Sequence, residues 1–299
     1  MKKVLLGAHM PTSGGFYRAA IFGKEVGCSA IQIFTKSNRQ WHASIITNED
    51  SETFSKAIKD NNIAYVVAHA SYLINLAGPE LATQKKSVQA LEIELSRCAQ
   101  LKITDLVLHP GAKKDLPEEM ALKQVAQNIN LALKSSPKTT RILLETMAGQ
   151  GSTIGNNFEQ LATILSHVHD QDRIGICVDT CHIFAAGYDF STTEKYHQLW
   201  HDFNKIIGLN KLGLVHLNDS KKELNSRVDR HDAIGSGKIG QKAFELIMND
   251  EKLINIPKIL ETPKEDLAMD QKNLKYLVAL LKKDNLRFIK DTNLEIYLD

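Results

Sequence analysis

Residues 174–182 carry the sequence Ile-Gly-Ile-Cys-Val-Asp-Thr-Cys-His, a short apolar run that ends at the acidic residue Asp179. A continuous run of this length, rich in β-branched residues, is typical of a strand that is buried on both faces. Similar runs recur along the whole chain. The set is Lys3–Ala8, Ala30–Phe34, Ile63–Ala68, Asp105–Leu108, Arg141–Leu144, Ile174–Val178, Leu212–Val215 and Ile256–Leu260.

Longer amphipathic segments separate these runs and have the periodicity of helices. They include Pro79–Leu101, Glu118–Leu133, Phe158–His167, Thr192–Gly208, Gln241–Asn249 and Glu265–Lys283. Alternating strands and helices indicate βαβ units and a parallel sheet. Eight such units predict the α/β class and a closed (β/α)8 TIM barrel rather than an open sheet. We expect one barrel domain over residues 1–285, followed by a tail, 286–299, to which the pattern assigns no role.

Composition excludes several classes of protein. Hydrophobic residues make up 43% and charged residues 24% of the 299 residues, which argues against disordered and collagen-like chains. The net charge of +2 neither requires nor excludes a nucleic-acid partner. Four cysteines are too few for a disulfide framework, and no apolar run is long enough to span a membrane. We therefore expect a cytoplasmic protein with reduced thiols and no membrane association.

Side chains that can bind metals follow the predicted strands with the period of one β/α unit. The third to eighth strands end at His69, His109, Glu145, Asp179, His216 and Glu261. Three more candidates lie just beyond strand ends: His182, Asp229 and His231. The carboxyl ends of barrel strands meet at one mouth, where active sites are built. One such histidine is more often structural, but six consecutive strand ends of this kind are hard to obtain by chance.

Imidazole together with carboxylate is a ligand set for zinc, with manganese or iron as alternatives. A catalytic ion needs about four ligands and leaves a position open, so nine candidates predict two or three ions. One further motif, Gly235–Gly240, matches a dinucleotide-binding pattern but follows a long loop instead of a strand. We therefore expect no nucleotide cofactor.

Clustered metal ions about 3.5–4 Å apart are typical of phosphodiester hydrolysis. Metal-dependent sugar isomerases and epimerases also place such ligands at a barrel mouth, and the fold does not decide between the two reactions.

Longer motifs around these residues resemble those of endonuclease IV, the zinc-dependent apurinic/apyrimidinic endonuclease family. The matching segments are 69–75 (HASYLIN), 109–111 (HPG), 145–146 (ET), 175–182 (GICVDTCH), 216–221 (HLNDSK), 229–231 (DRH) and 261–263 (ETP). The match covers nearly the whole chain from His9 onward. Two positions depart from the family pattern: Asn225 stands where glycine is usual, and Ser37 where an amide is expected.

The resemblance implies a DNA repair enzyme with three zinc ions. His69, His109 and Glu145 would bind the first ion, Glu145, Asp179, His216 and Glu261 the second, and His182, Asp229 and His231 the third. A hydroxide between the first two ions would attack the phosphate on the 5′ side of an abasic site, with Glu145 and Glu261 as catalytic carboxylates. The products would be a 3′-hydroxyl and a 5′-deoxyribose phosphate, and the family also trims blocked 3′ ends.

The expected partner is double-stranded DNA that contains an abasic site, bound by a monomer through loops at the barrel mouth. Lys36 and Arg39 suit phosphate contacts or insertion into a groove. Tyr72 and Leu73 resemble the wedge residues that enter the kinked duplex when the abasic nucleotide is flipped out. A sugar isomerase or epimerase, and a binder of damaged DNA without catalysis, are the alternative hypotheses.

Overall fold

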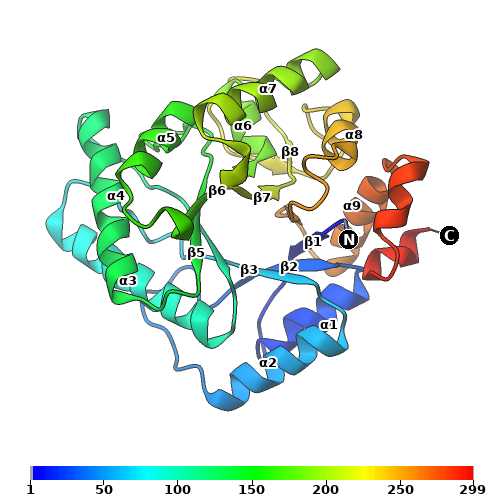
Figure 1. Cartoon of the computed structure of the whole chain (residues 1–299), viewed down its shortest axis with the longest axis horizontal. Coiled ribbons are helices and arrows are strands. Elements are labelled where there is room, and N and C mark those ends of the chain that lie inside the picture. The colour runs from blue at the N-terminus through cyan, green and yellow to red at the C-terminus, as the bar shows by residue number, and fades with distance from the viewer. Residues whose placement is uncertain (1–2, 299) are drawn as a thin grey trace.

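Eight parallel strands close into a barrel in the computed structural model, which describes residues 3–298 (Figure 1). The strands are β1 (Leu6–His9), β2 (Ala30–Phe34), β3 (Tyr65–His69), β4 (Asp105–Leu108), β5 (Arg141–Glu145), β6 (Ile174–Asp179), β7 (Leu212–His216) and β10 (Lys258–Leu260). They follow one another around the barrel in chain order, and β10 pairs with both β7 and β1. The predicted (β/α)8 TIM barrel is therefore confirmed.

Helices cover the outside of the barrel. They are α1 (Tyr17–Glu25), α2 (Asn48–Asp60), α3 (Leu81–Gln100), α4 (Glu118–Ser135), α5 (Phe158–His167), α6 (Thr180–Ala186), α7 (Thr193–Ile206), α8 (Gln241–Asn249) and α9 (Leu267–Ala279). Short 3-10 turns are η1 (Gln171–Arg173), η2 (Leu209–Lys211), η3 (Lys283–Phe288) and η4 (Asn293–Tyr297). Local caps set several helix starts: at α2, Thr47 and Asp50 each accept a hydrogen bond from the other's backbone N–H. None of the helices in residues 3–298 has the length and apolar character of a membrane span.

Side chains inside the barrel form layers, because residues two apart on a strand point to the same face. The middle layer is apolar and consists of Ala30, Val67, Val107, Leu143, Cys177, Leu214 and Ile259. The residues two positions further along these strands are Gln32, His69, His109, Glu145, Asp179, His216 and Glu261. An apolar plug thus supports a polar ring at the carboxyl end of the barrel.

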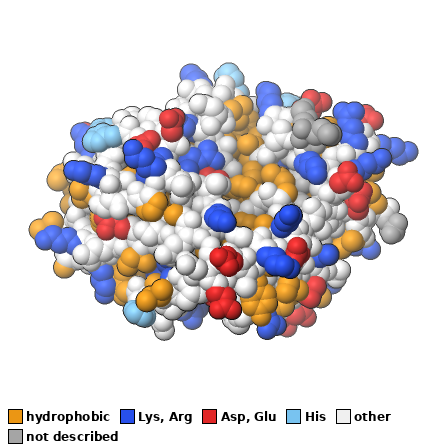
Figure 2. Space-filling view, turned by 60° about the horizontal axis from the view of Figure 1, so that its bottom comes forward, with side chains coloured by type: hydrophobic (Ala, Val, Ile, Leu, Met, Phe, Trp, Pro, Cys, Tyr) orange, Lys and Arg blue, Asp and Glu red, His pale blue; other side chains and the backbone are white. Residues whose placement is uncertain are grey.

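The outer surface carries both signs of charge. Figure 2 shows one face on which Lys and Arg side chains alternate with Asp and Glu, with hydrophobic groups between them. This interspersion agrees with the small net charge of +2.

The residues after Asn285 pack against the first units of the barrel. Asn293 donates from its side-chain amide to the carbonyl oxygens of Cys28 and Asn61, both at 2.8 Å. Ile289 and Leu294 are fully buried. Cys28 lies just before β2 and Asn61 follows α2, so the segment fastens the end of the chain to the connections at the amino-terminal end of the barrel.

We expect Asn293→Ala to lower the free energy of unfolding by about 1–2 kcal/mol, because two carbonyl groups lose their donor. Urea denaturation followed by circular dichroism measures this difference. Lys290→Ala, an exposed change in the same segment, is the control and should stay within about 0.5 kcal/mol of the parent. Equal effects of the two variants would show that the Asn293 contacts do not fasten the segment.

Candidate metal centre

The nine predicted metal ligands converge at the carboxyl end of the barrel. Their ligand atoms form three groups, and within each group all atoms lie within 4.8 Å of one another; a fourth set within the same limit adds the buried Cys181 to Asp179 and His231. The groups are His69, His109 and Glu145; Glu145, Asp179, His216 and Glu261; and His182, Asp229 and His231. These are the groupings that the family resemblance implies, and Glu145 belongs to two of them.

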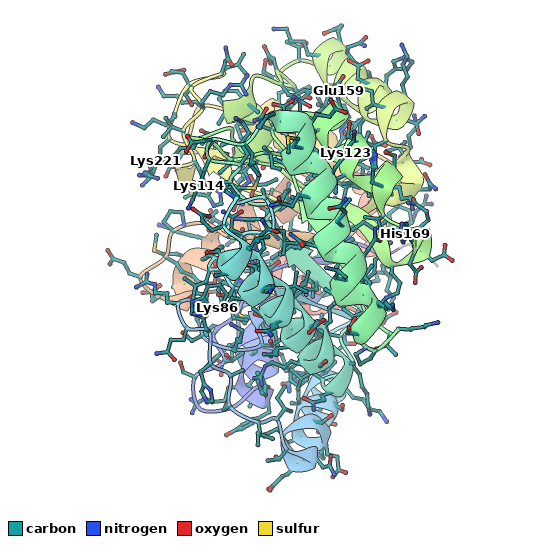
Figure 3. All side chains as sticks on the ribbon, turned by 90° about the vertical axis from the view of Figure 1, so that its left-hand side faces the viewer. Lys86, Lys114, Lys123, Glu159, His169 and Lys221 are labelled. Carbon is teal, nitrogen blue, oxygen red and sulfur yellow. The ribbon has the colours of Figure 1, made fainter. Side chains whose placement is uncertain are left out.

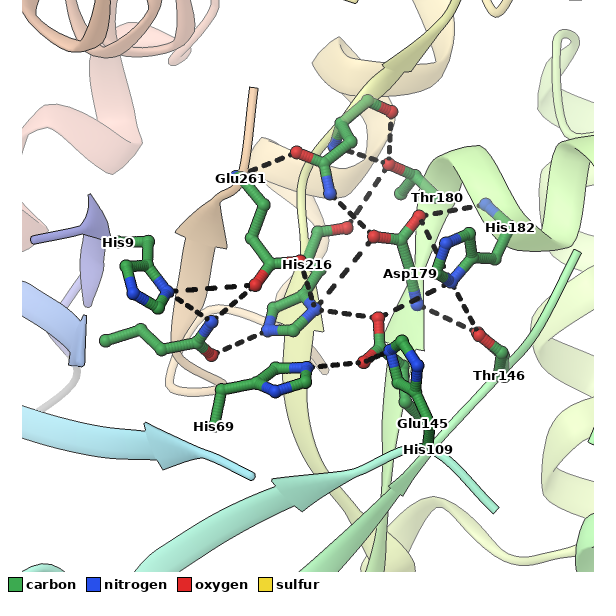
Figure 4. Close-up of polar contacts among 12 residues, drawn as sticks. His9, His69, His109, Glu145, Thr146, Asp179, Thr180, His182, His216 and Glu261 are labelled. Atoms are coloured by element: carbon green, nitrogen blue, oxygen red, sulfur yellow. Dashed lines mark hydrogen bonds and ion pairs between the residues drawn. The ribbon is translucent and has the colours of Figure 1, made fainter. Parts of the chain in front are cut away.

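Glu145 lies at the middle of the cluster and is completely buried. Its Oε2 atom is 3.2 Å from Nε2 of His69 and 3.0 Å from Nε2 of His109 (Figure 4). Its Oε1 atom is 3.0 Å from Nδ1 of His216 and 3.4 Å from Nδ1 of His182. Each oxygen therefore faces a different set of imidazoles, which suits a carboxylate that bridges two cations.

The second group surrounds Nδ1 of His216. This atom is 3.3 Å from Oε2 of Glu261 and 3.9 Å from Oδ2 of Asp179. In the third group, the two oxygens of Asp229 lie 3.2 Å from Nε2 of His182 and 3.3 Å from Nε2 of His231. Asp179 Oδ2 is also 3.7 Å from Nε2 of His231, so the groups are contiguous.

Backbone carbonyl groups orient three of the imidazoles. Nδ1 of His69 donates to the carbonyl oxygen of Ala70 at 2.7 Å, and Nδ1 of His182 donates to that of Thr146 at 2.8 Å. Nδ1 of His231 donates to the carbonyl oxygen of Glu261 at 3.1 Å. With the proton held on Nδ1, the lone pair of Nε2 faces the cluster, as is usual for histidines that bind metals.

Two buried imidazole nitrogen atoms lack a hydrogen-bond partner within residues 3–298, and this indicates whether the site fits a cation. Nε2 of His182 and Nε2 of His231 are buried and make no hydrogen bond, although carboxylate oxygens lie within 3.3 Å of each. A buried polar atom without a partner is costly, and a coordinated cation would satisfy both. The mixture of imidazole nitrogens and carboxylate oxygens therefore fits divalent cations such as zinc.

The charges of the cluster depend on one another. Burial alone would raise the pKa of Glu145, but His216, His109 and His182 hold it well below the usual value for glutamate. Burial alone would lower the pKa of His182, but the carboxylates of Asp179, Asp229 and Glu145 raise it well above the usual value for histidine. Without a cation, protons on imidazoles therefore balance the buried carboxylates.

Outer residues that the sequence analysis missed support the ligands. Asn218 donates to Oδ2 of Asp179 at 2.6 Å, and its side-chain oxygen accepts the backbone N–H of Glu261 at 2.8 Å. The hydroxyl oxygen of Thr146 accepts the N–H of Asp179 at 2.9 Å. Asn218 follows His216 by two positions, so the strand period could have indicated it.

A short hairpin places the third group. Strand β8 (Asp219–Ser220) pairs antiparallel with β9 (His231–Asp232), which brings the loop with Asp229 back to the barrel mouth. The buried carboxylate of Asp219 accepts the backbone N–H groups of Gly235, Gly237 and Ile239 at 3.0–3.1 Å. The backbone N–H groups of the Gly235–Gly240 loop, which matches a dinucleotide-binding pattern, thus bind a carboxylate of the protein itself.

Asn225 and Ser37, the two departures from the family pattern, each accept a hydrogen bond from a residue two positions later in the chain. Asn225 has a φ of 61°, a left-handed conformation that asparagine tolerates better than most residues. Its side-chain oxygen accepts a hydrogen bond from Nε of Arg227 at 3.2 Å. The hydroxyl oxygen of Ser37 accepts the N–H of Arg39 at 3.4 Å.

Of the four residues predicted to contact DNA, three lie at the surface of the mouth. Arg39 is exposed, Tyr72 is 53% exposed, and Leu73 is half-buried. The ring of Tyr72 lies 5.2 Å from that of His69 and 5.4 Å from that of His109, directly beside the predicted ligands.

The side chain of Lys36 lies inside the loop instead. It is 2% exposed, its ammonium lies 3.6 Å from Oε1 of Glu94, and it donates to the carbonyl oxygen of Gln40 at 2.9 Å. Glu94 also accepts the hydroxyl of Thr35 at 2.6 Å and the N–H of Ser71 at 3.2 Å. This arrangement connects the loop of Arg39 to the loop of Tyr72, whereas a phosphate contact by Lys36 stays a prediction.

Comparison with known proteins gives consistent matches. Residues 22–287 match the family model described as "Xylose isomerase-like TIM barrel". A protein of Geobacter sulfurreducens named "Probable endonuclease 4" is 44% identical over 93% of this chain and 95% of its own length. A protein of Chloroflexus aggregans with the same name is 47% identical over 92% and 97%. The crystal structure of endonuclease IV from Thermus thermophilus superposes with a TM-score of 0.82 at 32% identity, covering 92% of this chain and 98% of that one.

We expect binding of Zn²⁺ to the metal-free protein to release protons at pH 7, because His182 and His216 hold protons there that a cation must displace. Proton release should decline as the pH rises past the raised pKa of these histidines. Calorimetric titration in two buffers of different ionisation enthalpy measures the number of protons.

The His182→Ala variant should release fewer protons than the parent protein. His169→Gln is the matched control, since His169 is exposed in the connection between α5 and β6 (Figure 3), which leads into the amino-terminal end of that strand, whereas the cluster lies at the carboxyl end. Tight binding without proton release would contradict the charge balance described above.

Proposed function

Because the chain belongs to the endonuclease IV family, we propose that it hydrolyses the DNA phosphodiester bond on the 5′ side of abasic sites with a cluster of three zinc ions. The observation that carries this proposal is the set of three contiguous ligand groups, two of which share Glu145. The products would be a 3′-hydroxyl and a 5′-deoxyribose phosphate. Trimming of blocked 3′ ends by the same centre, action as a monomer and a cytoplasmic location are part of the proposal.

Bound zinc ions would supply a nucleophile from water at neutral pH and stabilise the charge that develops on the phosphate and the leaving oxygen. Glu145 would hold two ions at a fixed separation, because its two oxygens face different imidazoles. Glu261 has a side chain that is 13% exposed and lies at the mouth, where it would position the attacking water and accept its proton. The buried side chains of Asp179 and His216 would fix the cluster from below.

Recognition of the lesion would depend on loops outside the metal cluster. Tyr72 and Leu73 lie next to His69 and would enter the duplex where an abasic nucleotide leaves the base stack. Flipping costs less at an abasic site, because no base has to be unstacked. This difference gives selectivity for damage without a contact that reads sequence.

Exposed lysine side chains outside the metal cluster also suit contacts with the DNA backbone. Lys86, Lys114 and Lys221 lie along one edge in Figure 3, and all three are exposed. Lys114 follows β4 and Lys221 follows β8, so both belong to loops at the mouth. Phosphate contacts of this kind contribute affinity that falls as the salt concentration rises.

A metal-dependent sugar isomerase or epimerase is the second candidate, since such enzymes use similar ligands on barrels. It would require an enclosed polar pocket above the cluster. The exposed aromatic ring of Tyr72 and the exposed Arg39 at the mouth favour the DNA substrate instead.

The main prediction is that zinc-loaded protein cuts an end-labelled duplex only at a single abasic site and leaves a 3′-hydroxyl. Glu145→Gln should reduce incision on the order of 10²–10³-fold or more while the fold is kept. Glu159→Gln, the same change at an exposed position on α5, is the control and should leave the rate unchanged. Gel mapping of the product ends, beside an undamaged duplex, measures both.

Three outcomes of this assay would contradict the proposal or parts of it. Binding of the duplex without cleavage would indicate a binder of damaged DNA. Neither binding nor cleavage would direct the search to sugars. A Glu145→Gln variant that cuts at the parental rate would remove the role assigned to Glu145.

We expect Tyr72→Ala to raise KM for the abasic duplex by roughly 5- to 150-fold, the range that corresponds to losing one aromatic contact with DNA. Zinc content and hydrolysis of bis(p-nitrophenyl) phosphate, which is too small to need a wedge, should not change. If the variant loses zinc, as measured by mass spectrometry, Tyr72 supports the cluster instead of contacting DNA.

A further inference from the structure

Gln32 is a fully buried residue of β2 whose side chain belongs to the same ring as the predicted ligands. Its Oε1 atom lies 2.8 Å from Nε2 of His216. Its Nε2 atom lies 2.5 Å from Oε1 of Glu261 and 3.0 Å from Nδ1 of His9. One amide thus contacts two predicted ligands that follow it by 184 and 229 residues in the chain.

The chemistry of its partners determines how this amide is oriented. An ionised carboxylate only accepts hydrogen bonds, so the amide group that faces Glu261 is the NH₂ group. The amide oxygen must then face His216, whose Nε2 atom must carry the proton. The second N–H of the amide donates to Nδ1 of His9, so the polar atoms of the Gln32 side chain all have partners.

This orientation determines which atoms remain for a cation. With the proton on Nε2, the lone pair of His216 is on Nδ1, the atom that faces Glu145, Asp179 and Glu261. With Oε1 of Glu261 bound to the amide, its Oε2 atom is the one that lies 3.3 Å from Nδ1 of His216. His216 also differs from His69, His182 and His231, which backbone carbonyls orient in the opposite sense, with Nε2 free.

We propose that Gln32 is a positioning residue for the second metal ion of the cluster: its amide selects the Nε2-protonated tautomer of His216 and directs Oε2 of Glu261 to the ion. This inference rests on the proposed function. Among the described residues, no backbone carbonyl orients His216, so a side chain of β2, which is not a neighbour of β7 in the barrel, does so. Replacement of this kind of outer partner typically weakens metal binding by about 10–100-fold.

Gln32→Met tests the proposal, because methionine keeps the approximate volume and removes the hydrogen bonds. We expect the second of three zinc ions to be lost to a competing chelator at a 10–100-fold lower chelator concentration, while the other two ions keep their affinity. In the cobalt-substituted protein, the visible absorption spectrum should change in the component that belongs to one ion. Gln32→Glu should have a larger effect, because a second carboxylate would face Glu261.

Histidine NMR provides a readout that a merely structural role would not change. In the zinc-loaded parent protein, the ¹⁵N shifts of His216 should identify the Nε2-protonated tautomer, and Gln32→Met should shift the population toward the other tautomer. On an abasic duplex, kcat should fall while KM stays the same, because Gln32 is buried below the mouth and would not contact DNA.

The matched control is Gln124→Met, the same substitution at a glutamine of α4 that donates to the carbonyl oxygens of Leu76 and Gly78. It should leave zinc affinity and the cobalt spectrum unchanged. Unchanged zinc affinity, spectrum and tautomer in Gln32→Met would overturn the inference while the proposed function stands. A parent protein that binds no zinc would instead contradict the proposed function, so the two failures are distinguishable.

Discussion

The burial of Glu145 is the constraint on which the rest of the centre depends. A completely buried carboxylate without compensation would be protonated or would destabilise the fold, because the interior solvates charge poorly. Four imidazoles within 3.4 Å provide the compensation, and each comes from a different barrel strand or from the segment that follows it. The closed barrel brings these strands together, so the centre depends on the fold.

The barrel and the predicted metal ligands can both be predicted from the sequence, because both follow from the pattern of the strands. Barrel strands are buried on both faces, so each appears in the sequence as a continuous apolar run. Such a run can be identified without knowing which strand it pairs with. Strand period and strand end then determine which residue reaches the mouth, as Leu143 and Glu145 illustrate on β5. The structure brings together every ligand that was predicted in this way.

Contacts between distant segments are the part that the sequence does not predict. Gln32 lies in the middle of an apolar run, and its importance depends on partners 184 and 229 residues away. Lys36 has the charge that a phosphate contact needs, yet its ammonium group lies inside the loop, 3.6 Å from Glu94 of α3. Asn293 and the chain around it follow the last repeat of the pattern, so only the packed structure assigns them a role.

The predicted metal ligands and the residues predicted to contact DNA lie on different parts of the fold. Ligands on strands are held by the barrel, where a displacement of one side chain would disturb several neighbours. Arg39 and Tyr72 lie on loops, but Glu94 joins both loops to one helix through Thr35 and Ser71. Each loop is hydrogen-bonded to the scaffold at its base and exposed at its tip. Its tip can therefore contact DNA while its position relative to the metal cluster stays fixed. The same barrel with different loops could therefore present the same ligands to a different substrate, which is why the loops, more than the ligands, argue for DNA.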